Sequence, residues 1–127
     1  MSNNVLLAKA FNAGGAIVAN SIVKAGANDY DVLQADGPTA AAKLIGITLE
    51  VGANSAQRID VCLLGVVDCK LGGTVARGDP VTSDGSGYGV TAAPSAGTNN
   101  RIVGIAMISG VSGDVIPVWV APSMMQG

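Results

Sequence analysis

Histidine is absent from this chain of 127 residues, and aromatic and charged side chains are scarce. The missing imidazole removes the commonest general base and metal ligand, together with every nucleophile that an adjacent histidine activates. Charged residues form 13% of the chain, against a usual share of roughly 25%. Because 49% of the residues are hydrophobic, we expect some apolar surface to face a partner rather than water. The composition therefore favours an oligomer over a compact monomer.

The shortage of aromatic residues limits what can fill the core. The aromatic side chains are Phe11, Tyr30, Tyr88 and Trp119, so valine, isoleucine, leucine and alanine must form most of the interior. A chain of this length fits one domain well and two poorly. Each buried aliphatic side chain contributes roughly 1.5–3 kcal/mol. With 18 glycines and many alanines, the isolated monomer is expected to be only marginally stable.

Further absences disfavour several classes of partner. The formal net charge is −2 and the seven basic residues are scattered, whereas binding to DNA phosphates needs clustered lysine and arginine. No uninterrupted apolar run reaches the roughly 18 residues of a membrane helix. Residues 1–4 carry no basic segment ahead of an apolar one, as a signal peptide would. We therefore expect neither nucleic acid nor a membrane as a partner.

The two cysteines and the aspartates offer little chemistry. Cys62 and Cys69 match neither a C-x-x-C pair nor a zinc site, which predicts two free, mostly buried thiols. If one continuous strand held both, their odd spacing would aim them at opposite faces. Aspartates beside glycine ordinarily bond nearby backbone N–H groups in turns, so we expect turns rather than catalysis, and no cofactor or metal. Four aspartates have a glycine neighbour: Asp36, Asp79, Asp84 and Asp114.

Apolar runs and turn signals predict about nine short strands and scarcely any helix. In residues 58–67, Ile59, Val61 and Leu63 alternate with other residues. The run then becomes continuously apolar, as in a strand covered on both faces. Residues 38–44 hold the best helix candidate, but we expect most of them to be extended. Pro117 cannot donate to a ladder, so the last strand is expected at an edge or at a bulge. The fold class predicted is all-β, as a small irregular barrel or sandwich.

One short pattern occurs three times: two bulky aliphatic residues, a glycine and another aliphatic residue. A glycine inside an aliphatic strand weakens it, so its recurrence indicates bends or bulges where another backbone comes close. Because the pattern holds no reactive group, it is typical of a scaffold. The three copies are Leu44-Ile45-Gly46-Ile47, Leu63-Leu64-Gly65-Val66 and Ile102-Val103-Gly104-Ile105.

The last two thirds of the chain resembles a family of phage head proteins known as capsid cement or decoration proteins. The order of its motifs carries the resemblance: a strand, an Ala-Arg-Gly-Asp-Pro-Val turn at residues 76–81, a Val-Gly-Ile-Ala strand at 103–106, and a Gly-Asp-Val strand start at 113–115. The resemblance implies the architecture of the lambda-type decoration protein, which is a compact, irregular, β-tulip-like domain and often trimeric.

The resemblance also implies a structural role without catalysis. The partners would be the major capsid protein and further copies of this chain, as a homotrimer or alternatively a dimer. The protein would assemble in the host bacterial cytoplasm and lie on the outer surface of the virion head. There it would stabilise the expanded capsid by bridging major capsid subunits. A β-rich oligomeric tail-fibre or receptor-binding module is the alternative, and a small-molecule-binding barrel is a third.

This hypothesis divides the chain into an N-terminal arm or strand at residues 1–12 and a single β domain at 13–127. An extended arm can add a strand to the edge of a capsid sheet, although the same residues could instead complete the domain's own sheet. The expected oligomer interface contains Trp119, Pro117 and Met124. The expected capsid contacts are Ser2, Asn3, Asn4, Val5, Leu6 and Leu7.

Overall fold

The computed structural model describes residues 3–127, which form β-strands joined by turns and one short 3₁₀ turn. The all-β prediction is confirmed, and so is the irregular barrel-like architecture. The elements are β1 (Asn4–Ala13), β2 (Ile22–Ala25), β3 (Asp31–Gln34), η1 (Ala40–Ala42), β4 (Leu44–Thr48), β5 (Arg58–Lys70), β6 (Pro80–Ser83), β7 (Gly89–Thr91), β8 (Asn99–Ala106) and β9 (Val115–Gln126).

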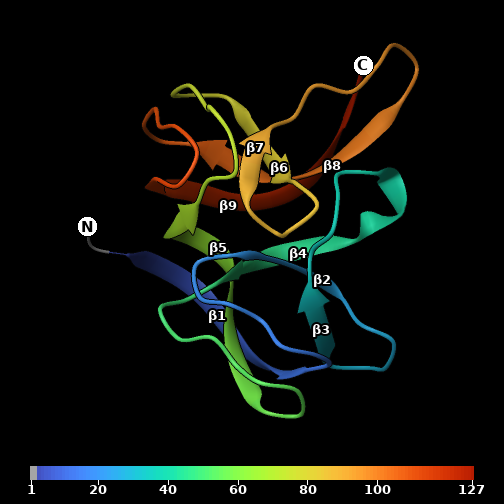
Figure 1. The fold of residues 1–127 in the computed structure, drawn as a ribbon, viewed down its shortest axis with the longest axis vertical. Coiled ribbons are helices and arrows are strands. Elements are labelled where there is room, and N and C mark those ends of the chain that lie inside the picture. Colours follow the sequence, from blue (N-terminus) through green and yellow to red (C-terminus); the bar gives the residue numbers. More distant parts are fainter. Residues whose placement is uncertain (1–2) are drawn as a thin grey trace.

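Five strands close into a ring. Strand β1 pairs with β3, β3 with β2, β2 with β4, β4 with β5, and β5 returns to β1. Only the β1–β3 pairing is parallel, and it consists of two register pairs, Asn12 with Asp31 and Ala13 with Val32. The ring forms the lower half of the molecule in Figure 1. Its interior is filled by a small aliphatic core of Ala13, Ile17, Val23, Val32, Ile59 and Val61.

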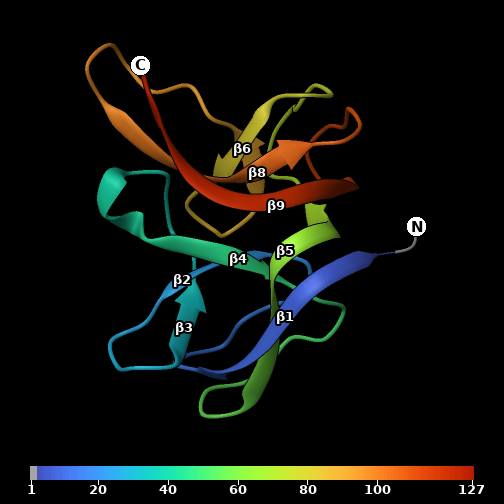
Figure 2. The same cartoon turned by 180° about the vertical axis from the view of Figure 1, so that it is seen from behind.

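Strand β5 continues beyond the ring and carries the same nine-stranded sheet into the other half of the molecule. We call the part of this sheet beyond the ring the second sheet. The last residues of β5 pair with β9, and the order then runs β9–β8–β6–β7. In Figure 2 this second sheet lies above the ring, with β9 curving across the front. A single strand of 13 residues therefore joins both halves of the molecule.

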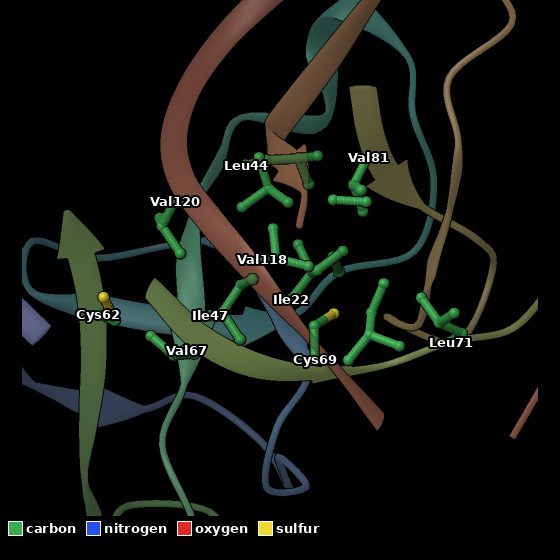
Figure 3. Packing of buried hydrophobic residues seen from close by; sticks show 14 of the residues in the cluster. Ile22, Leu44, Ile47, Cys62, Val67, Cys69, Leu71, Val81, Val118 and Val120 are labelled. Atoms are coloured by element: carbon green, nitrogen blue, oxygen red, sulfur yellow. The ribbon is translucent and has the colours of Figure 1, made fainter. Parts of the chain in front are cut away.

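The main core lies between the ring and the second sheet. Figure 3 shows Ile47 of β4 and Val67 of β5 close to Val118 and Val120 of β9. Aromatic side chains take no part in this cluster, which agrees with the expected aliphatic interior. Its buried members are Ile22, Ala35, Ala42, Leu44, Ile47, Cys62, Val67, Cys69, Leu71, Val75, Val81, Val103, Ala106, Ile116, Val118 and Val120.

All three repeated glycines lie where a strand register shifts. The shifts occur in β2–β4 beside Gly46, in β1–β5 beside Gly65, and in β8–β9 beside Gly104. A Cβ added at Gly46 would collide with the Cys62 carbonyl, and one added at Gly104 would collide with the Trp119 carbonyl. At Gly65 the backbone has φ +131°, a value that side chains disfavour. The expected bulges and close backbone approaches are confirmed.

These bulges let neighbouring residues serve different cores. In β4, Leu44 and Ile47 face the main core whereas Ile45 packs against the ring core. In β5 the alternation likewise breaks between the ring and the second sheet. Cys62 and Cys69 therefore both face the main core, although an unbroken strand would aim residues seven apart at opposite faces.

One local expectation needs correction, and another is confirmed in one of its two alternatives. Residues 38–44 were expected to be mostly extended, but Ala40–Ala42 form a 3₁₀ turn that ends where Lys43 adopts the left-handed conformation. The last strand was expected to lie at an edge or to contain a bulge because of Pro117. Strand β9 lies between β5 and β8 and does contain a bulge, between Val120 and Ser123. Pro117 itself lies outside this bulge, opposite Asp68. It is accommodated because its imide nitrogen faces the end of β8. There the Pro117 carbonyl accepts the Met107 N–H (3.0 Å), one residue past the last residue of β8.

We predict that Gly46→Ala and Gly104→Ala each lower the free energy of unfolding by about 1–3 kcal/mol, because the new methyl group meets fixed backbone. Urea denaturation of the purified chain measures the change. Gly37→Ala and Gly85→Ala are the matched controls, since nothing lies within 4 Å of an added Cβ at either position. Equal midpoints for all four variants would contradict the close approach.

Candidate functional site

The turn aspartates bond to backbone, as expected from their glycine neighbours. Asp84 Oδ1 accepts the N–H groups of Ser86 (2.8 Å) and Tyr88 (3.0 Å). The Asp79 carboxylate accepts the Ala76 N–H (3.0 Å), and the Asp114 carboxylate accepts the Val111 N–H (2.9 Å). These three carboxylates therefore fix the shapes of three turns.

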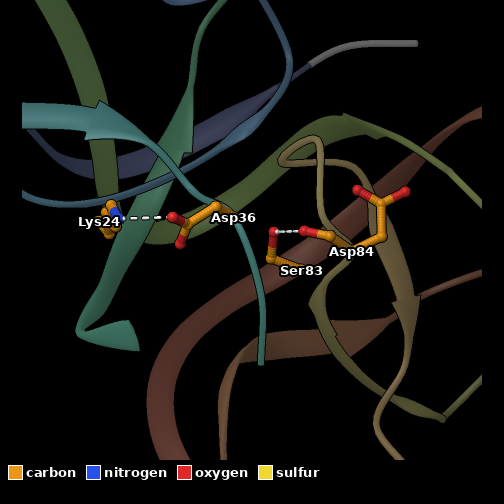
Figure 4. Close-up of polar contacts among 4 residues, drawn as sticks. All are labelled: Lys24, Asp36, Ser83 and Asp84. Atoms are coloured by element: carbon orange, nitrogen blue, oxygen red, sulfur yellow. Dashed lines mark hydrogen bonds and ion pairs between the residues drawn. The ribbon is translucent and has the colours of Figure 1, made fainter. Parts of the chain in front are cut away.

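Asp36 differs from the other three because it forms an ion pair. Lys24 Nζ lies 2.9 Å from Asp36 Oδ2, and this ion pair joins β2 to the segment that follows β3 (Figure 4). The Asp36 side chain is largely exposed, and such surface pairs contribute only about 0–1 kcal/mol. In the same view the Ser83 hydroxyl donates to the Asp84 carbonyl (2.8 Å), which stabilises the start of the next turn.

Among residues 3–127, no three cysteine, aspartate or glutamate side chains gather closely enough to hold a metal ion. The same residues contain no helix long and apolar enough to cross a membrane.

Both cysteines are free and buried, as the sequence predicts. Burial raises the pKa of the Cys69 thiol to about 12, and it also raises the pKa of the Cys62 thiol. Because the thiolate is the reactive form, these side chains behave as small core residues.

The N-terminal segment is a strand of the domain's own sheet. Strand β1 pairs antiparallel with β5 from Asn4 opposite Val66 to Asn12 opposite Arg58. Asn3 Oδ1 also accepts the Asp68 N–H (3.2 Å). Of the two alternatives for residues 1–12, the described part is therefore a paired strand and not a detached arm.

The expected capsid-contact residues have different environments. Ser2 lies outside the described residues, and Asn4 is exposed. Val5 packs against the main core, so its side chain contributes to stability. Leu6 and Leu7 are 78% and 52% exposed, and they are the large apolar side chains that this strand offers to a partner.

The outer face of the second sheet is also apolar. Strand register places Val66, Trp119, Ile105 and Pro80 side by side across β5, β9, β8 and β6. Residues directly opposite in a sheet share one face. Val66, Ile105 and Pro80 are half-buried, and Trp119 is 49% exposed. We call these four residues the Trp119 row.

The expected oligomer-interface residues also differ in their exposure. Trp119 and Met124 are exposed, whereas Pro117 is buried within the chain. Val66 and Ile105 were not predicted as interface residues, although both belong to the repeated glycine pattern. The continuously apolar part of β5 was expected to be covered on both faces, yet Leu64 is 41% exposed. One face of this strand is open in the single chain.

Several hollows lie beside the ring. One, of about 630 Å³, is bordered by Asn3 and residues 49–52 and 58–60. A second, of about 490 Å³, has Phe11, Ile45 and Leu63 among its lining residues, together with residues 25–31. A third, of about 290 Å³, shares Phe11 and Tyr30 with the second and adds Ala10, Asn12 and Arg58.

Comparison with known proteins shows a likeness in fold. No family model matches the chain, and no curated protein matches it in sequence. A solved structure, the head fiber gp8.5 N base of bacteriophage phi29, superposes with a TM-score of 0.62. The match covers 95% of this chain and 98% of that one, at 13% sequence identity. At this identity the likeness shows a shared fold.

We predict that neither thiol of the native chain reacts with Ellman's reagent at pH 8, and that both react after unfolding in guanidinium chloride. Burial denies access to the sulfurs, and the raised pKa values keep them protonated at this pH. The absorbance of the thiolate that the reagent releases gives the number of cysteine thiols that have reacted. Rapid release of two equivalents from the folded chain would show that the core around β5 opens.

Proposed function

We propose that this chain is a structural protein of a bacteriophage head that binds the outer surface of the shell as a decoration or cement protein. The observation that carries the proposal is the end-to-end correspondence of its fold with the base of a phage head fiber. The ordered motifs at residues 76–81, 103–106 and 113–115, which resemble head decoration proteins, point to the same class.

The surface of the chain suits such a role. It carries two separate apolar areas, Leu6 with Leu7 on β1 and the Trp119 row on the second sheet. One area would contact the major capsid protein and the other would contact a further copy of the chain, as a trimer or a dimer. An oligomer whose subunits each bind modestly binds tightly as a whole, because later contacts are intramolecular.

The proposed action is mechanical and involves no catalysis. Each oligomer would touch two or more shell subunits and resist their separation when the head is filled with DNA. The closed ring and shared strand β5 suit this load, because pulling on β1 must break a ladder that runs from Asn4 to Asn12. The sparse charge and net charge of −2 suit a protein that remains outside the shell and away from the genome.

A second candidate is the base of a head fiber. It is favoured by the phi29 head fiber gp8.5 N base, the structural neighbour described above. Both candidates place the chain on the head surface, so electron microscopy distinguishes them. A decoration protein adds compact density to the shell, whereas a fiber base supports a projecting extension.

We predict that Leu6→Asp and Leu7→Asp each weaken binding to expanded heads at least tenfold, or about 1.4 kcal/mol. Both side chains are exposed and lie outside the buried clusters, so a charge there disrupts a docking contact more than the fold. Co-sedimentation with heads assembled without this chain measures the affinity. Val51→Asp, at a 76% exposed position in a loop, is the matched control.

Unchanged affinity for both leucine variants would exclude Leu6 and Leu7 as the contact. Failure of the wild-type chain to bind heads would remove the proposed function itself. Truncation of residues 1–7 is a poorer experiment, because it also removes Val5 from the main core.

We further predict that the chain self-associates through the Trp119 row and that Trp119→Glu shifts it towards monomer. A glutamate would place an unpaired charge in the centre of an apolar contact. Sedimentation velocity over a range of concentrations gives the mass. Val51→Glu serves as the control, and a wild-type chain that stays monomeric at high concentration would rule the interface out.

A further inference from the structure

One edge of β1 has no partner strand over most of its length. The ladder to β5 occupies one side of the strand, and β3 covers the other side only at Asn12 and Ala13. The Asn12 N–H points to this second side, where it donates to the Tyr30 carbonyl (2.8 Å). By the alternation of a strand, Ala8 and Ala10 turn their N–H and C=O groups to the same side. Within residues 3–127, no strand pairs with them there.

The free edge runs into two of the hollows beside the ring, those of about 490 Å³ and 290 Å³. Ala10 borders the smaller hollow, and Phe11 and Tyr30 border both. The larger hollow also contains Ile45 and Leu63, which lie at the margin of the ring core and are only partly buried. Unpaired backbone groups therefore lie next to an apolar pocket of about 490 Å³. This combination is typical of sites that capture an extended peptide, because the edge supplies hydrogen bonds and the pocket supplies specificity.

The rim of the pocket carries charges of both signs, of which Lys9 and Asp31 are engaged within the fold and Asp29 is not. Lys9 Nζ lies 5.4 Å from the centre of the Tyr30 ring, which holds that ring at the mouth. The Asp31 carboxylate is used within the fold, because it accepts the side-chain amides of Asn12 (3.0 Å) and Asn28 (3.1 Å). Asp29 is exposed, and its carboxylate makes no hydrogen bond or ion pair within the described part of the chain.

We propose that an extended segment of the shell protein adds a strand to the free edge of β1 and inserts an apolar side chain into the pocket formed by Phe11, Ile45 and Leu63. The proposal rests on the proposed function and names the part of the partner that binds. Asp29 selects a segment with a lysine or arginine beside the apolar residue.

A second copy of this chain fits the free edge of β1 and its pocket less well. Its net charge is −2, so it would bring further negative charge towards Asp29. The Trp119 row, which we assign to contacts between copies, lies on the second sheet. The free edge of β1 and its pocket therefore stay available to a different protein in an assembled oligomer.

The experiment compares variants in binding to expanded heads assembled without this chain. Ala10→Pro removes one outward N–H while leaving the ladder to β5 intact, and Ala10→Ser keeps that N–H at the same position as the control. Asp29→Lys reverses the charge at the rim of the pocket, and Asp29→Asn is its milder counterpart. We expect Ala10→Pro and Asp29→Lys to bind at least tenfold more weakly than wild type, and Ala10→Ser to bind as wild type does.

A photo-crosslinker identifies the occupant directly. With benzoylphenylalanine in place of Ala8, irradiation on heads is expected to yield one crosslinked peptide of the shell protein, containing an apolar residue next to a basic one. Circular dichroism and urea midpoints establish that each variant is folded. If Ala10→Pro proves unstable, Asp29→Lys and the crosslink carry the test.

The outcomes separate this inference from the function on which it rests. A wild-type chain that fails to bind heads overturns both. A wild-type chain that binds heads while Ala10→Pro and Asp29→Lys bind equally well overturns the inference alone. Crosslinks to another copy of this chain, or none to the shell protein, also overturn it.

Discussion

The whole molecule depends on one shared strand. Strand β5 completes the five-stranded ring with its first residues and begins the second sheet with its last. Gly65 marks the change, where the backbone adopts φ +131° and lies against Asn4 and Leu6 of β1. Since both cores pack against this strand, neither half of the chain can be distorted without straining the other. A stiff, two-part body of this kind is a sound basis for a protein whose proposed task is to bear load.

The same strand geometry creates the surfaces that a partner can use. Closing a ring from strands as short as β3 leaves most of one β1 edge unpaired. Extending β5 into the second sheet leaves Val66 and Trp119 on an open face. Both interaction areas therefore follow from how the chain divides its strands between two cores, and neither needs a special loop.

Much of this architecture could be predicted from the sequence, because the signals were local. Glycine within an aliphatic run predicts a close backbone approach, and Gly46, Gly65 and Gly104 all show it. Ring closure could not be predicted, because the pairing of β1 with β5 joins residues that are far apart in the chain. For the same reason the pocket beside Phe11 was not foreseen, since Ile45 and Leu63 reach it only after the ring has closed.

The pairing of β1 with β5 also has a consequence for biosynthesis. Asn12 pairs with Arg58 and Asn4 with Val66, so the first strand leaves the ribosome well before its partner exists. At roughly 5–20 residues per second, the delay lasts on the order of seconds, during which Leu6 and Leu7 have no sheet to join. The first strand can therefore join its sheet only after translation has passed β5.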